Sequence, residues 1–106
     1  MIKVTYNPAE YRMEIQGHAD YGEYGKDIVC GAASMLTMTL ENMVYDHAEA
    51  MRPQTHRSKG ECKICCAPTK GNRQKCLTIF DTIFGGFELL SLNCPDHVQT
   101  VKIKEE

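Results

Sequence analysis

Two side chains in the first third of the chain are suited to nucleophilic chemistry. His18 and Cys30 are separated by twelve positions, and the segment between them contains Gly22 and Gly25. An imidazole titrates near neutral pH, so it can take a proton from a thiol and return it to a leaving amine. A thiolate formed in this way attacks carbonyl carbon. Taken singly, Cys30 could instead be a buried structural thiol and His18 a surface histidine. The spacing alone therefore leaves the catalytic and the structural interpretation open.

The segment around this pair predicts how the two side chains would be brought together. Three glycines between positions 17 and 25 predict a loop over residues 17–26, because glycine disfavours a regular helix or strand. A helical apolar pattern begins after Asp27, which we expect to be the N-cap of the helix. Cys30 then falls in the first turn, where free N–H groups favour an anion. Gly22 and Gly25 leave room for an extended peptide to approach the backbone.

The remaining elements follow from periodicity and from turn residues. Residues 2–6 and 11–16 alternate as a hairpin, and an apolar stripe that includes His47 predicts a helix over 27–52. We expect a strand over 61–67, a helix over 72–93 and a last strand over 98–104. Gly85 and Gly86 in the second helix indicate close packing or a bend. This order, ββαβαβ, predicts an α+β fold in which two helices pack on a mixed four-stranded sheet. Self-association would be the simplest way to cover its open face.

Composition excludes several classes of function. The 106 residues are the size of one domain, so we interpret 1–106 as a single unit. A formal net charge of −2, with scattered lysines and arginines, argues against a nucleic-acid binder or a membrane-surface binder. We see no apolar run long enough for a membrane span and no signal-like N-terminus. These features predict a cytoplasmic protein.

The string from Gly17 to Ser34 resembles the signature of the ribosomal-processing cysteine protease family, Prp. That signature has Gly-His-Ala, a glycine-bearing loop, and then Gly-x-Asp-Ile-Val-Cys-Ala-Ala-x-Ser at a helix start. The order of elements fits elsewhere, but the segment from Pro53 to Arg73 departs from the family and contains unexpected cysteines.

The resemblance implies a homodimeric endopeptidase that uses no cofactor, with Cys30 and His18 as its catalytic dyad. Family members remove a short N-terminal extension from the large-subunit ribosomal protein L twenty-seven, cutting after an aromatic pair. Phage relatives act on virion proteins, which is an alternative for this chain. Ser34, one turn beyond Cys30, is a candidate for binding the substrate backbone, and Asp27 could orient the site.

The other cysteines suggest a competing interpretation. Cys62-x-x-Cys65 and Cys94-x-x-His97 have the spacing of a structural zinc site, which would make the protein a zinc-stabilised interaction module. Strand alternation, however, places Cys62 and Cys65 on opposite faces, which is unsuited to chelation. We therefore expect no metal, and we interpret Cys62, Cys65, Cys66, Cys76 and Cys94 as reduced thiols.

Overall fold

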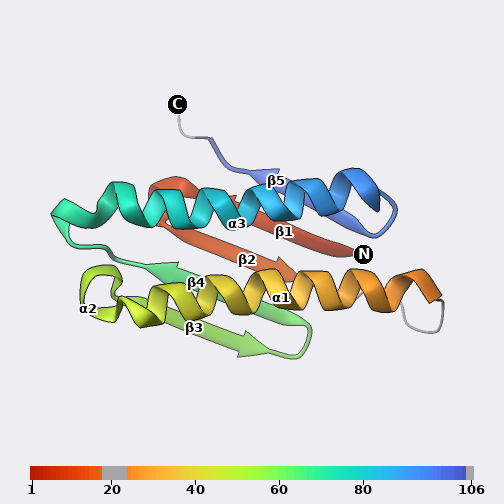
Figure 1. Ribbon diagram of the computed structural model, residues 1–106, viewed down its shortest axis with the longest axis horizontal. Coiled ribbons are helices and arrows are strands. Elements are labelled where there is room, and N and C mark those ends of the chain that lie inside the picture. The colour runs from red at the N-terminus through yellow and green to blue at the C-terminus, as the bar shows by residue number, and fades with distance from the viewer. Residues whose placement is uncertain (18–23, 105–106) are drawn as a thin grey trace.

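The computed structural model describes residues 1–17 and 24–104, except for the side chains of 24–27. Its helices lie side by side on one face of a sheet (Figure 1). The strands are β1 (Ile2–Asn7), β2 (Arg12–Gln16), β3 (Pro53–Ser58), β4 (Glu61–Cys66) and β5 (Val98–Lys102). The helices are α1 (Tyr24–Asp46), the short α2 (Ala48–Met51) and α3 (Arg73–Asn93), with 3-10 turns at Pro8–Glu10 and Lys70–Asn72.

The sheet is mixed, as predicted, and has one strand more than the predicted four. Its order is β3-β4-β2-β1-β5, with β1 parallel to β5 and every other pair antiparallel. The α+β class with two main helices on the sheet is confirmed. β3 escaped prediction because it begins with a proline and is otherwise polar, a composition that is tolerated at a sheet edge.

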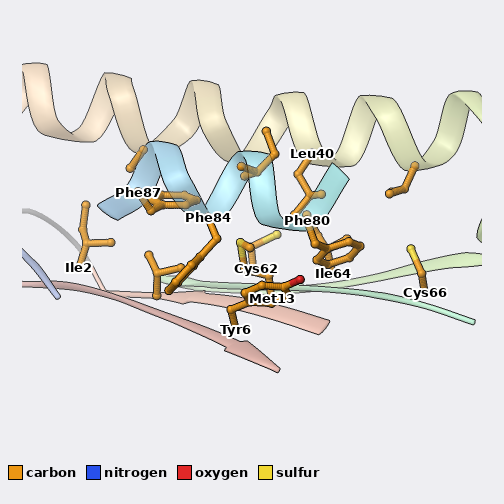
Figure 2. Close-up of a cluster of buried hydrophobic side chains, with 14 of the residues drawn as sticks. Ile2, Tyr6, Met13, Leu40, Cys62, Ile64, Cys66, Phe80, Phe84 and Phe87 are labelled. Atoms are coloured by element: carbon orange, nitrogen blue, oxygen red, sulfur yellow. The ribbon is translucent and has the colours of Figure 1, made fainter. Parts of the chain in front are cut away.

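The core lies between the two long helices and the sheet (Figure 2). Apolar residues recur along α1 with helical spacing, and α3 contributes three phenylalanines to the same layer. Its largest fully buried side chains include Tyr6, Met13, Leu40, Met51, Phe80 and Phe87. The hydroxyl of Tyr6 donates to Asp81 at 2.6 Å, so this buried phenol keeps a polar partner. His47, expected in the apolar stripe, is exposed where α1 ends and α2 begins.

Core packing accounts for part of the hydropathy of α3. By length and composition alone, the segment Lys70–Asn93 could cross a membrane. Its phenylalanines Phe80, Phe84 and Phe87 are instead buried in the core. A core helix meets the same compositional test, so this segment gives little support to a membrane location.

The face of the sheet opposite the helices is polar. Glu14 lies 3.5 Å from the Arg12 guanidinium and 3.6 Å from the Lys63 ammonium on the neighbouring strand. Cross-strand charge pairs of this kind suit a solvated face. This face is therefore compatible with water, and self-association stays a prediction.

Gly86 lies where α3 packs against Leu36 of α1. A Cβ built on Gly86 would lie 2.6 Å from Cδ2 of Leu36 on α1, whereas a Cβ on Gly85 would meet nothing within 4 Å. The close packing predicted from the glycine pair is therefore present at Gly86. α3 runs without interruption from Arg73 to Asn93.

We predict that Gly86→Val lowers the free energy of unfolding by about 1–3 kcal/mol, because the added methyl groups overlap Leu36. Gly85→Val, the matched control in the same helix, should change it by no more than about 0.5 kcal/mol. Urea denaturation of both variants measures the difference. Equal stability of the two would show that Leu36 does not limit the approach of the helices.

Candidate active site

A pocket of about 350 Å³ opens between α1 and the hairpin formed by β3 and β4. Its walls come from four parts of the chain that are distant in sequence. They are lined by Ile2, Ile15, Gly17, Cys30, Ala33, Ser34, Thr37, Met38, Arg57, Ser58, Gly60, Glu61 and Cys62. The pocket thus brings Cys30 and Ser34 together with the end of β2, where the chain continues to His18.

Cys30 lies on α1 and is half-buried beside the core. The helix begins at Tyr24, so the predicted start at Asp27 is wrong, and Asp27 is inside the helix rather than its N-cap. A single glycine costs a helix only about 1 kcal/mol, so Gly25 does not prevent this earlier start. Cys30 consequently lies in the second turn. A thiolate there is stabilised less by the positive end of the helix dipole, because that electrostatic effect falls off within the first turn.

The structure does not describe every predicted site residue. His18 and Gly22 lie outside the described residues, and so does the side chain of Asp27. The backbone of Gly25 is helical, which corrects the loop predicted through residue 26. The dyad of Cys30 and His18 therefore stays a prediction.

Gly17 fixes the direction in which the chain leaves β2 towards His18. Its φ is +93°, and a Cβ there would lie 2.2 Å from the carbonyl oxygen of Met1. The N–H of Gly17 donates to the carbonyl of Gly60 at 2.8 Å. This bond joins the end of β2 to the turn of the β3–β4 hairpin. Only glycine combines this conformation with so close an approach of backbone.

Ser34 lines the pocket one turn beyond Cys30 with an available hydroxyl. The hydroxyl of Thr37 donates to the carbonyl of Ala33 at 2.8 Å, and that of Thr39 donates to Met35 at 2.7 Å. Within the described part of the chain, the Ser34 hydroxyl makes no such bond. It is free to bind a ligand in the pocket.

The other thiols lie in different surroundings. Cys62, Cys66 and Cys76 are buried, and burial is the main factor that raises the pKa of the Cys62 thiol. A hydrogen bond between Cys66 and Cys76, together with burial, raises the pKa of Cys66, and the same bond lowers that of Cys76. Cys65 lies on the opposite face of β4, as alternation predicted.

No metal cluster is formed by the placed side chains. Among residues 1–17 and 28–104, no three His, Cys, Asp or Glu side chains gather closely enough to hold a metal ion. All six cysteines are free thiols. The two zinc-like pairs of the sequence therefore do not converge.

The wall facing Cys30 was missed by sequence analysis. This wall is the turn of the β3–β4 hairpin, where the unpredicted strand β3 ends and β4 begins. It consists of Arg57, Ser58, Gly60 and Glu61. The sequence predicted a strand from Glu61 onward, but it gave no signal that the residues before it would line a pocket with Cys30. Their proximity to Cys30 depends on tertiary packing, which local spacing does not encode.

Comparison with known proteins identifies the family. The sequence matches the protein-family model described as "Cysteine protease Prp" over residues 1–99. The chain belongs to this family. It is therefore a cysteine protease, an enzyme that hydrolyses peptide bonds. No curated protein sequence matches the chain.

Solved structures share the fold. A Streptococcus mutans protein, SMU.848, is 27% identical with a TM-score of 0.72, over 98% of this chain and 93% of that one. An essential ribosomal processing protease Prp from S. aureus, with a covalently linked product peptide, is 23% identical with a TM-score of 0.80, over 97% and 100%. The same S. aureus protease with a substrate peptide is 22% identical with a TM-score of 0.75, over 96% and 97%. At these identities the two S. aureus structures support the fold alone.

We predict that Gly17→Ala lowers the free energy of unfolding by about 1–3 kcal/mol, because alanine is strained at this φ and its methyl group overlaps the Met1 carbonyl. Gly71→Ala is the matched control, since a Cβ at Gly71 would meet nothing within 4 Å. Thermal unfolding of both variants tests this. A Gly17→Ala protein as stable as the control would show that the chain can leave β2 by another path.

Proposed function

We propose that this protein is an endopeptidase that removes a short N-terminal extension from a ribosomal protein of the large-subunit L twenty-seven type. Cys30 is the nucleophile and His18 the general base. The observation that carries this proposal is that Cys30 and Gly17 line the same pocket. Because His18 directly follows Gly17, the base is attached to the rim of the pocket that contains the thiol.

The chemistry follows from these roles. His18 takes the Cys30 proton, and the sulfur attacks the scissile carbonyl carbon to give a tetrahedral intermediate. Collapse of this intermediate breaks the C–N bond, the leaving amine receives the proton from His18, and a thioester remains on Cys30. Water, deprotonated by His18, hydrolyses the thioester and releases the second product as a carboxylate.

The oxyanion needs donors from outside the α1 backbone. From the fifth helical residue onward, each N–H of an α-helix is bonded to the carbonyl four residues earlier. The N–H of Cys30 falls in this bonded part, since α1 begins at Tyr24. The unpaired hydroxyl of Ser34 is the donor we assign to the substrate backbone near the scissile bond.

The pocket lining supports a substrate with aromatic residues before the cut. Ile2, Ile15, Ala33 and Met38 give it apolar walls, and a thioether is a favourable neighbour for an aromatic ring. The S. aureus relative is described as a ribosomal processing protease, which is the activity we propose here. We place the enzyme in the cytoplasm, where its six free thiols would stay reduced. The homodimer implied by the family resemblance stays a prediction, measurable by sedimentation.

We predict that Cys30→Ala abolishes cleavage of a peptide containing Phe-Phe-Ala, because no other group supplies the nucleophile. His18→Ala should lower the rate by about 10²- to 10⁴-fold. Cys65→Ala is the control, since Cys65 is also a half-buried thiol but lies on the far face of the sheet and should leave the rate unchanged. Mass spectrometry of the products reports both the rate and the bond that is cut. Cleavage by Cys30→Ala would disprove the assignment.

A further inference from the structure

The wall opposite Cys30 carries a cation that is paired with a carboxylate on α1. Arg57 lies on β3 and lines the pocket, and its Nη2 pairs with Oε1 of Glu41 on α1. The arginine side chain is 54% exposed and that of Glu41 is 27% exposed. The pair therefore spans from the hairpin to the same helix that carries Cys30.

The ion pair leaves most of the guanidinium available. Arginine has five N–H donors, and the contact with Glu41 joins one nitrogen to one oxygen. In the part of the chain that the structure describes, Arg57 has no second hydrogen-bond partner. The remaining donors lie at the wall of the pocket, where a bound peptide would pass. Carbonyl oxygens of an extended main chain are acceptors that any peptide offers.

Glu41 also neutralises the charge of Arg57 at this wall. The two groups act on the Cys62 thiol in opposite directions, since Arg57 lowers its pKa and Glu41 raises it, both by less than burial does. The other ionic residue among the described lining is Glu61, whose Oε1 accepts from Nε2 of Gln16 at 3.4 Å. The Arg57–Glu41 pair is neutral overall and keeps spare donors for dipoles, while the Glu61 carboxylate leaves the described wall with one negative charge.

We propose that Arg57 binds main-chain carbonyl oxygens of the peptide substrate, and that Glu41 is a positioning residue that orients the guanidinium and neutralises its charge. The inference rests on the proposed function, since it concerns the same pocket. It assigns to the hairpin, where the sequence departs from the family signature, the task of holding the peptide beside Cys30.

The test uses three peptides that contain Phe-Phe-Ala and differ only by Glu, Gln or Lys at one position near the scissile bond. The Glu-to-Lys ratio of kcat/KM for the wild-type protein is the reference. Arg57→Ala should lower kcat/KM by about 10- to 100-fold for each peptide, mainly through KM, which is the size of a lost hydrogen bond to a charged group. Glu41→Gln should leave an uncompensated cation. The Glu-to-Lys ratio of kcat/KM should then rise by about threefold or more over that of the wild-type protein at low salt.

Tyr45→Phe separates this role from a structural one. The hydroxyl of Tyr45 donates to Oγ1 of Thr55 at 3.1 Å, so it also ties α1 to β3, but neither residue lines the pocket. If Glu41 merely anchors the hairpin, Tyr45→Phe should change the Glu-to-Lys ratio of kcat/KM in the same way as Glu41→Gln. An unchanged Glu-to-Lys ratio in Glu41→Gln, or wild-type kinetics in Arg57→Ala, would overturn the proposal.

Binding to the Cys30→Ala variant gives a second readout that needs no turnover. Calorimetry should show that adding Arg57→Ala to the Cys30→Ala variant weakens the binding of each peptide. The dissociation constants of the three peptides should rise by a similar factor. If the wild-type protein cleaves none of the peptides, the proposed function fails, and this binding comparison still decides the role of Arg57. Equal binding with and without Arg57 would refute it.

Discussion

The close packing of α1 against α3 is the constraint on which the site depends. Leu36 occupies the space that Gly86 leaves open, so the two helices lie nearer to each other than two side chains would allow. Both helices rest on the sheet through a layer that includes Leu40, Phe80 and Phe87 (Figure 2). Since cores are close-packed, α1 cannot slide or rotate without opening voids or overlaps. The height and rotation of the helix that carries Cys30 are thereby fixed.

The pocket is completed by segments that meet only in the folded chain. Gly17, at the end of β2, is tied to Gly60 in the hairpin turn, and the hairpin is tied to α1 through Arg57 and Glu41. These contacts join groups that lie far apart in sequence. A pocket built in this way is a property of the tertiary structure, and each contact restrains a different wall. The chain leaving Gly17 towards His18 starts from the restrained end of a strand.

Sequence periodicity predicted the parts of this fold that bury apolar side chains. The spacing of Val29, Ala33 and Leu40 identified α1, and the alternation of Cys62 and Ile64 identified β4. Periodicity did not predict the elements that bury few apolar side chains. β3 is polar because one of its edges is free, and the start of α1 passes through Gly25 because one glycine is a small cost. The candidate nucleophile was found from a local signature, whereas the wall around Arg57 required the packed structure.

The placement of the pocket residues on α1 shows how one helix serves stability and chemistry together. Successive residues of an α-helix are rotated by about 100°. Val29 and Ala33 point into the core, so Cys30 and Ser34, each one residue later, point together towards the pocket beside it. The core therefore specifies the direction of the thiol and of the serine hydroxyl, and Cys30 also packs against its edge. A substitution that shifts the buried stripe of α1 would move both pocket groups by the same rotation.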